Sequence, residues 1–350
     1  KKPVIILGGG ARISDAGEEA HEFSKKTGIP IATSVAAYNL IPEDYELYIG
    51  VPGTYSRECT NRILSEADLF IFIGSSTGGQ VTHFWKIPEI GTKVIQIGID
   101  PSDLGRNYPN EISLLGDAKT TLQQILKENL TQLKIDDWRE KSINIVNEWK
   151  AELNKLRDSD SKPIRPERLM KELSEVIPED SIVASDTGHT AMWTVQNLWM
   201  NKKWNFIRCA GSLGWGFPAA IGAKCAFPDK NVFCLTGDGG LWYHFTELET
   251  AVRSDIPTIT IVNNNNALNQ EYDIFMNAYD GKPSNRWTEM WYFNKVSFAE
   301  LANNMGAFGI RVTDPTDIKE AVKEAMKSKK PSIVEIDGDV NALAPTAWSK

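Results

Sequence analysis

Short apolar runs, rich in valine, isoleucine and phenylalanine, recur along the chain and alternate with longer segments in which apolar residues have helical spacing. Apolar runs of this length that end in glycines or polar turns predict buried strands, and the segments between them predict amphipathic helices. Strands are predicted at residues 4–7, 29–34, 69–74, 93–100, 181–185, 231–237, 258–262 and 332–337. Strands that alternate with helices favour parallel sheets that helices cover on both faces.

A change of pattern divides the chain. From about Lys134 to Asp160 the sequence is charged, helical in spacing and poor in core residues, which is typical of a connector with a surface helix. We therefore predict an α/β fold with two doubly wound parallel-sheet (Rossmann-like) domains. They span residues 1–133 and 163–350 and are joined by a helical connector at residues 134–162.

Composition and charge narrow the function classes. The 350 residues are 41% hydrophobic and carry a net charge of −8, which is ordinary for a soluble globular protein. No nucleic-acid partner is expected, because nonspecific binding of nucleic acid needs lysines and arginines that neutralise phosphates. No membrane partner is expected either, since no apolar run approaches the roughly 20 residues that span a bilayer. A cytoplasmic protein is the expectation.

The cysteines and the start of the chain add two further expectations. None of the four cysteines forms a C-x-x-C pair or clusters with a histidine, which favours buried free thiols in a reducing compartment over a disulfide framework or a zinc site. The opening KKPVIILGGG runs directly into a strand and is not a signal peptide. We expect that further chain precedes it.

Three polar turns follow predicted strands of the second domain. They are Ser185–Thr190, Gly237–Gly240 and Asn263–Asn266. Open α/β sheets bind ligands at this carboxyl edge, and a strand-helix-strand crossover returns the chain to the same edge. Asp238 and Asn265 can therefore face each other, and with the carbonyl of Ala267 they offer oxygen ligands that suit Mg²⁺ beside a diphosphate. Each turn taken alone is more simply a loop, because glycine, aspartate and asparagine are common turn residues.

Taken together, these motifs resemble the thiamine-diphosphate-dependent enzymes of the acetolactate synthase and pyruvate decarboxylase group. The fingerprint of that group is Gly-Asp-Gly followed, after a helix and a strand, by Asn-Asn, and GDGGLWYHFTELETAVRSDIPTITIVNN matches it throughout. AGSLGWGFPAAIGA resembles the glycine-rich loop of the group, and SDTGHTAMW resembles the turn that meets the diphosphate from the other side. VIQIGIDPSDLGRNYP and GDAKTTL resemble parts of the central domain, so that the resemblance covers essentially the whole chain.

The resemblance implies roles for individual residues. Asp238 and Asn265 would bind Mg²⁺ by their side chains, and Ala267 by its carbonyl. Leu213 would be the catalytic wedge that folds the cofactor until its aminopyrimidine reaches the thiazolium carbon, or else a core leucine. His189, the second implied catalytic residue, would bind phosphate or transfer a proton, or instead cap the following helix. The residues implied to contact the cofactor are Thr187, Gly188, His189, Gly211, Leu213, Gly237, Asp238, Gly239, Gly240, Asn265, Ala267, Leu268, Asn269 and Gln270.

The resemblance also implies a reaction. It is the thiamine-diphosphate- and Mg²⁺-dependent cleavage or formation of a carbon–carbon bond next to a carbonyl, on a small-molecule 2-oxo acid. The alternatives are a lyase that acts on 2-hydroxy ketones or 2-hydroxyacyl-CoA, and a nucleotide-binding regulatory protein that kept the fold and lost catalysis. A homodimer or homotetramer is expected, since family members bind the cofactor between subunits.

Departures from the family pattern set further expectations. We find no amino-terminal pyrimidine-binding domain, which supplies the glutamate that activates the cofactor, so we expect this domain in cis or in trans and an inactive chain without it. ALNQEYDIF stands where acetolactate synthases have Gly-Met-Val, so the substrate-facing surface should differ. GSSTGGQVTHFW lacks the arginine and paired aspartates of FAD-binding members, which leaves open whether FAD or another adenine nucleotide binds the central domain.

An aromatic-rich run at residues 276–298 follows the predicted metal loop. It is interpreted either as ordinary loop packing or as a mobile cover over the cofactor. In the second case Trp287, Trp291 and Tyr292 would wall an apolar substrate pocket.

Overall fold

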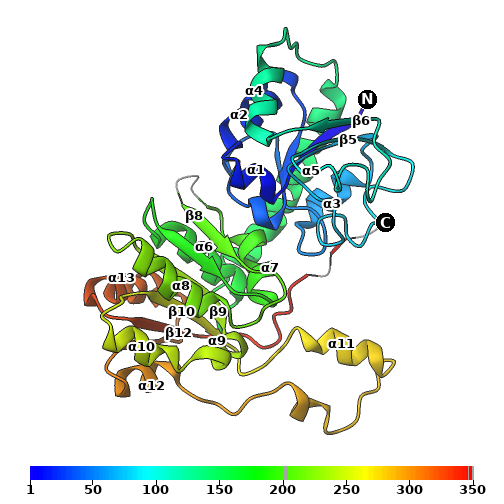
Figure 1. Cartoon of the computed structure of the whole chain (residues 1–350). Coiled ribbons are helices and arrows are strands. Elements are labelled where there is room, and N and C mark those ends of the chain that lie inside the picture. Colours follow the sequence, from blue (N-terminus) through cyan, green and yellow to red (C-terminus); the bar gives the residue numbers. More distant parts are fainter. Residues whose placement is uncertain (201–203, 346, 349–350) are drawn as a thin grey trace. The chain divides into compact units, whose positions relative to one another are not determined.

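The computed structural model describes residues 1–200, 204–345 and 347–348. They form two compact units, the first built mainly on Lys1–Leu153 and the second on Asn154–Trp199 and the chain from Trp204 to Pro345. Each unit contains one parallel sheet with helices packed against it (Figure 1). The division falls within α5 (Asp136–Arg157), a helix in the segment that the sequence predicts to be a helical connector. The domain boundaries at 133 and 163 stay a prediction.

The first sheet has six parallel strands in the described part of the chain, in the order β3-β2-β1-β4-β5-β6. The strands are β1 (Pro3–Leu7), β2 (Ile31–Thr33), β3 (Tyr48–Gly50), β4 (Leu69–Ile73), β5 (Lys93–Gly98) and β6 (Ile112–Leu115). The shorter helices of this unit are α1 (Gly9–Ile13), α2 (Gly17–Thr27), η1 (Val35–Ala37), α3 (Glu58–Leu64) and α4 (Ala118–Lys127). This order reverses direction at β1, so the junction of β1 and β4 is the switch point at which such sheets bind ligands.

Alternate residues along the strands of the first sheet pack into two hydrophobic clusters, one on each face of the sheet. Ile5 on β1 packs into a cluster with Phe23 of α2 and Leu122 of α4. Its neighbour Ile6 points to the opposite face and packs in a second cluster with Trp138 of α5. Because both faces of the strands are covered, these segments are continuously apolar rather than alternating.

The second sheet has six parallel strands in the described residues, in the order β11-β12-β10-β9-β7-β8. The strands are β7 (Ile182–Ser185), β8 (Asn205–Arg208), β9 (Val232–Gly237), β10 (Ile259–Asn264), β11 (Phe308–Val312) and β12 (Ser332–Asp337). The helices are α6 (Pro166–Val176), α7 (His189–Asn197), α8 (Gly216–Ala226), α9 (Asp238–His244), α10 (Glu247–Arg253), α11 (Glu271–Ala278), η2 (Trp287–Met290), α12 (Phe298–Asn304), η3 (Pro315–Asp317) and α13 (Ile318–Ser328). Helices α8, α9, α10 and α12 contribute to one core cluster with this sheet.

The predicted α/β fold class with two Rossmann-like sheets is confirmed, and all the strands predicted from the sequence are present. The prediction missed β3, β6, β8 and β11, which are the edge strands of the two sheets. Within the described residues, none of the helices has the length and apolar character needed to cross a membrane.

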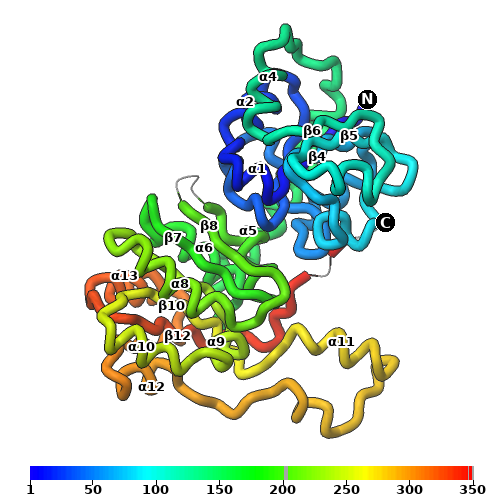
Figure 2. Tube along the Cα trace, viewed as in Figure 1, coloured from blue at the N-terminus to red at the C-terminus, as the bar shows by residue number. Residues whose placement is uncertain are grey.

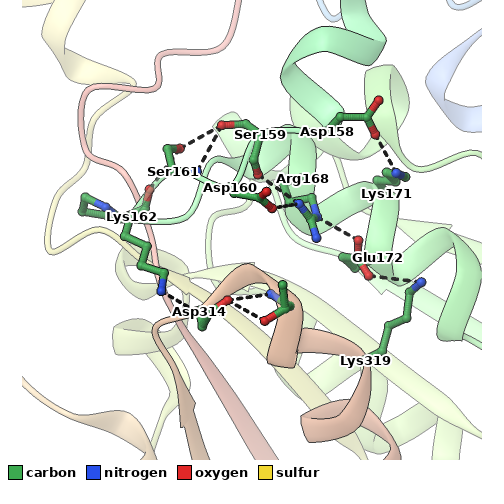
Figure 3. A network of polar contacts seen from close by, with 12 residues as sticks. Asp158, Ser159, Asp160, Ser161, Lys162, Arg168, Lys171, Glu172, Asp314 and Lys319 are labelled. Atoms are coloured by element: carbon green, nitrogen blue, oxygen red, sulfur yellow. Dashed lines mark hydrogen bonds and ion pairs between the residues drawn. The ribbon is translucent and has the colours of Figure 1, made fainter.

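Ion pairs fasten the segment after α5 to the second unit (Figure 3). Arg168 of α6 donates to Asp160 at 2.6 Å, to the carbonyl of Ser159 at 3.1 Å and to Glu172 at 2.8 Å. Glu172 also pairs with Lys319 of α13. The chain that enters the second unit is therefore held by side chains of that unit.

The aromatic-rich run forms an arm that extends away from the second sheet, with α11 near its far end (Figures 1 and 2). Helix α11 buries none of its residues. The ring of Trp291 packs against the rings of Trp287 and Tyr292, and Tyr272 of α11 packs on both tryptophans. The aromatic residues thus pack together within the arm, while a role as a mobile cover or a substrate wall stays a prediction.

Candidate functional site

A cleft lies at the carboxyl edge of the second sheet, where β7 and β9 end. From β7 the strand order proceeds to β8 on one side and to β9 on the other, so this junction is the switch point of the sheet. The lining residues are Thr187, Gly188, His189, Thr190, Leu213, Gly237, Asp238, Gly239, Gly240, Asn263, Asn265, Ala267, Leu268, Asn269, Gln270 and Glu271. Every residue that the resemblance implies for the cofactor is among them except Gly211, which is exposed on the loop before α8.

Asp238 is the first residue of α9 and follows directly on β9. Only 2% of it is exposed, and its Oδ2 accepts a 3.0 Å hydrogen bond from the backbone N–H of Ala267. Burial raises the pKa of Asp238 to about 7, although hydrogen bonds from backbone N–H groups oppose the shift. Among the described residues Asp238 has backbone partners and no ion pair, and a carboxylate buried in this way is stabilised by a bound cation.

Asn265 meets Asp238 just beyond the end of β10. Its Oδ1 accepts from the same Ala267 N–H, at 3.1 Å, so an amide oxygen and a carboxylate oxygen converge on one backbone group. The crossover that joins β9 and β10 produces this meeting, because the two strands pair in parallel register up to Asn263 opposite Gly237. The sequence prediction that Asp238 and Asn265 face each other agrees with this geometry.

The other three asparagines of the run have separate surroundings. Asn264 turns away from the cleft and donates to the buried Glu335 at 2.9 Å and to the carbonyl of Val296 at 3.1 Å. Asn266 has φ of +56°, a left-handed conformation that asparagine tolerates better than most residues. Asn263 lines the cleft, and its buried Oδ1 has no hydrogen-bond partner among the described residues.

Two glycines leave no room for a side chain at the start of α9. A Cβ added to Gly239 would lie 2.4 Å from Leu268 Cδ2, and one added to Gly240 would lie 2.5 Å from Asp186 Oδ2. Backbone N–H groups are thus open to close approach at the N-terminal turn of α9, where a negative group is favoured.

His189 begins α7 after Gly188, which has φ of +77°. Its Nδ1 lies 2.9 Å from Oδ1 of Asn269. Burial lowers the pKa of His189, and the bond to Asn269 partly offsets the shift. His189 therefore faces the cleft as a neutral imidazole near pH 7, and its side chain is not used to cap α7.

Leu213 lines the cleft from the loop that joins β8 to α8. It is partly exposed, which distinguishes it from the fully buried core leucines. A Cβ added to Gly188 would lie 4.0 Å from Leu213 Cδ1, so the leucine stands against the turn that follows β7.

Comparison with known proteins bears on what this cleft binds. Residues 186–336 match the thiamine pyrophosphate enzyme C-terminal TPP binding domain, and residues 1–125 match the central domain of the same enzymes. The chain belongs to the thiamine pyrophosphate enzyme family. It is 34% identical to the probable acetolactate synthase large subunit of Methanocaldococcus jannaschii over 96% of this chain and 57% of that protein. It is 30% identical to the acetolactate synthase large subunit of Haemophilus influenzae over 97% of this chain and 59% of that protein.

This member of the thiamine pyrophosphate enzyme family spans less than two thirds of the length of those relatives. Its cleft has donors and acceptors that suit a metal-bound diphosphate. Within the described residues there is no group of three or more His, Cys, Asp or Glu side chains that could hold a metal. A metal here would therefore rely on one carboxylate, neutral oxygens and the diphosphate itself, which is a set that suits Mg²⁺. The buried Oγ1 of Thr187 is also without a partner in the described part of the chain.

A second cavity lies at the switch point of the first sheet, in the part of the chain that matches the central domain. Its volume is about 630 Å³, and the turns after β1 and β4 line it with Gly8, Gly9, Gly10, Gly74, Ser75 and Ser76. Asp100, Asp103 and Asp117 lie along its wall, and no lysine or arginine does so in the described residues. This charge distribution agrees with the absence of the usual ionic partners of FAD from the sequence.

Some residues near the cleft were given no individual role in the sequence analysis, although Asp186, Thr190 and Asn263 lie in turns that it named. Thr190, Asn263 and Glu271 line it, and Asp186 is buried directly behind it. Asp186 lies inside the turn that the sequence analysis singled out, so its position at the carboxyl end of β7 was the available signal.

Proposed function

We propose that the chain contributes the diphosphate-binding half of a thiamine-diphosphate- and Mg²⁺-dependent enzyme that cleaves or forms a carbon–carbon bond next to a carbonyl, with a 2-oxo acid as substrate. The observation that carries the proposal is the convergence of Asp238 and Asn265 oxygens on the amide of Ala267, at the switch point of the sheet. The names of the relatives, acetolactate synthase large subunits, support a 2-oxo acid.

Each residue has a defined task in this proposal. Asp238 and Asn265 hold Mg²⁺ through their side chains and Ala267 holds it through its carbonyl, while the backbone at Gly239 and Gly240 approaches the diphosphate. Leu213 supports the cofactor in a folded shape. When bound, the cofactor supplies the carbon nucleophile that attacks the substrate carbonyl.

His189 has a task of its own. It presents to the cleft a neutral imidazole whose free nitrogen can accept a proton and later return it. We assign it no charge near pH 7, since burial favours the neutral ring.

We further propose that an amino-terminal pyrimidine-binding domain, in cis or as a separate chain, completes the site. Holding the diphosphate fixes only one end of the cofactor. The alignment of base and reacting carbon then depends on the second domain, and such positioning is commonly worth about 7–11 kcal/mol of barrier. Family members place the cofactor between subunits, so a homodimer or homotetramer is part of the proposal.

The test supplies the purified chain with thiamine diphosphate, Mg²⁺ and pyruvate, and follows carbon dioxide with and without the amino-terminal domain. We expect Mg²⁺-dependent cofactor binding by the chain alone and turnover only with the added domain. A chain that binds no thiamine diphosphate would refute the proposal, and turnover that the added domain leaves unchanged would refute the part concerning that domain. Parallel assays with a 2-hydroxy ketone and a 2-hydroxyacyl-CoA separate the lyase alternatives.

The cavity of the first unit favours a second candidate ligand, an adenine nucleotide. Its volume and its glycine-lined turns suit such a ligand, whereas its carboxylates disfavour a highly charged one. Flavin absorbance in the purified protein, or calorimetric binding of FAD, would support this candidate. If the chain binds a nucleotide but does not bind thiamine diphosphate, the result would instead favour a regulatory protein.

A further inference from the structure

Asp186 is a buried carboxylate that the proposed chemistry does not use. It follows the last residue of β7, and only 1% of it is exposed. Within the described residues its hydrogen-bond donors are backbone amides and a hydroxyl, with no lysine, arginine or histidine among them, so neutral groups stabilise it. A carboxylate in such a place needs several hydrogen bonds to offset its loss of water.

The two oxygens of Asp186 join three turns around the cleft. Oδ1 accepts from the N–H of Thr187 at 2.8 Å and from the N–H of Gly214 at 3.0 Å. Oδ2 accepts from the hydroxyl of Thr236 at 2.9 Å and lies 3.2 Å from the Gly214 nitrogen. One side chain thus links the turn after β7, the loop that carries Leu213, and the end of β9 just before Asp238.

The loop that carries Leu213 depends on Asp186 more than the other two turns do. Ala210, Gly211 and Ser212 are exposed, whereas Gly214 is buried. Gly214 has φ of +92°, and a Cβ there would lie 2.6 Å from Tyr243 Cβ, so its backbone is pressed against α9.

The hydrogen bonds of this loop support the dependence. Trp215 bonds back to Ser212 within the loop, and the backbone amides of Gly214 and, at the start of α8, Gly216 reach Asp186 on the turn after β7. The end of β9, by contrast, keeps its ladder with β10 and the bond between Asp238 and Ala267.

We propose that Asp186 is a positioning residue that fixes Leu213 relative to the metal and diphosphate turns, by holding the amide of the next residue, Gly214. The inference rests on the proposed function in one respect, namely that Leu213 supports the cofactor ring. Asp186 itself touches neither cofactor nor substrate in this assignment.

Two substitutions of Asp186 separate the effect of its hydrogen bonds from the effect of its charge. In Asp186→Asn, the amide oxygen can still accept from the two backbone N–H groups, and the amide NH₂ can donate to the hydroxyl of Thr236. That hydroxyl lies 3.0 Å from the carbonyl of Gly237, so it can donate its own proton there. Asp186→Ala leaves the amides of Thr187 and Gly214 without an acceptor. The asparagine variant should therefore keep the loop in place, and the alanine variant should release it.

The experiment measures binding by calorimetry for the 350-residue chain with Mg²⁺, using inorganic diphosphate and thiamine diphosphate as two probes. We expect Asp186→Ala to weaken thiamine diphosphate about tenfold and inorganic diphosphate less than about twofold, with Asp186→Asn within about threefold for both. Leu213→Ala should reproduce the alanine effect, and the double variant should bind no more weakly than either single variant, because one residue acts through the other. Hydrogen exchange across residues 209–215 should be faster in Asp186→Ala than in Asp186→Asn.

Several results would overturn the inference. They are equal losses for both probes, additive effects in the double variant, or an asparagine variant as impaired as the alanine variant. If Asp186→Ala does not fold, Asp186→Ser takes its place, since a serine hydroxyl can satisfy the nearby Thr187 amide and is too short to reach Gly214. A parent chain that binds thiamine diphosphate no better than inorganic diphosphate would refute the role of Leu213 in the proposed function. A parent chain that prefers thiamine diphosphate, with the preference intact in Asp186→Ala, would refute only the role of Asp186.

Discussion

His189 and Asn269, which come from α7 and from the loop after β10, are joined by a 2.9 Å contact between Nδ1 and Oδ1. Asn269 Nδ2 donates to the carbonyls of Val340 and Ala342, at 3.2 and 3.4 Å, which fixes its Oδ1 as an acceptor. The Nδ1 of His189 must therefore carry the proton, and Nε2 keeps its lone pair.

The first prediction concerns this tautomer. Nitrogen NMR of the selectively labelled chain should show His189 neutral and protonated on Nδ1 at pH 6.5. Because its folded pKa lies below the unfolded value, the unfolded chain takes up a proton first as the pH falls, and stability is lost below about pH 6.5. His189→Asn keeps a donor toward Asn269 and cannot titrate, so the melting temperature of the parent should fall more steeply than that of the variant between pH 7 and 5. Parallel curves would contradict the assignment.

The second prediction concerns the thiols. All four cysteines are free, but the expectation that they are buried holds for Cys59 and Cys234 and is wrong for Cys225, which is exposed on α8. Burial raises the pKa of Cys59 to about 12, so its reactive thiolate is scarce at pH 8. A maleimide at pH 8 should modify Cys225 within minutes, and Cys59 and Cys234 only on unfolding. Mass spectrometry of peptides identifies the modified sites, and early labelling of Cys59 would contradict its burial on α3.

The third prediction concerns Arg168. Its partner Glu172 is 7% exposed, so Arg168→Ala leaves a buried carboxylate with Lys319 as its remaining ionic partner among the described residues. We expect the free energy of unfolding of the chain to fall by about 1–3 kcal/mol. Lys162→Ala is the matched control, because Lys162 is 57% exposed and its pair with Asp314 is a surface pair worth less than about 1 kcal/mol. Equal losses in urea titrations of the two variants would contradict the stabilising role of the buried pair between Arg168 and Glu172.

Burial explains how much of the fold could be predicted. The four inner strands of each sheet are apolar on both faces and were all found, whereas the edge strands were missed. Most residues of β6 are exposed, and β11 buries only its last residue, so these sequences lack the continuous apolar run that marks an inner strand. β3 differs because it is buried, but its sequence YIG contains a glycine and only two apolar residues in succession, so it does not form an apolar run.

Some contacts of the candidate site could be predicted from the sequence in the same way, and others could not. The meeting of Asp238 and Asn265 could be predicted because a right-handed crossover preserves the sheet edge. The contact of His189 with Asn269, and of Asn269 with Val340, could not, because it depends on where the chain after β12 passes. The role of Asp186 also needed three dimensions, since its partners lie on three separate turns.

The last prediction concerns the metal. Asp238→Ala removes the buried carboxylate that neutralises the cation, and we expect it to abolish Mg²⁺-dependent binding of thiamine diphosphate in calorimetry. Asn265→Ala removes a neutral oxygen and should weaken binding by about tenfold, in line with the usual worth of one hydrogen-bonding or ligating group. Asn264→Ala is the neighbouring control, because Asn264 bonds to Glu335 away from the cleft; it should lower stability and leave the affinity of the folded protein for the cofactor nearly unchanged. Since burial raises the pKa of Asp238, removal of this charge should also leave the metal-free chain no less stable at pH 7. If Asp238→Ala and Asn265→Ala bind Mg²⁺ and cofactor as the parent does, the metal lies elsewhere and the convergence of these two side chains is only a turn.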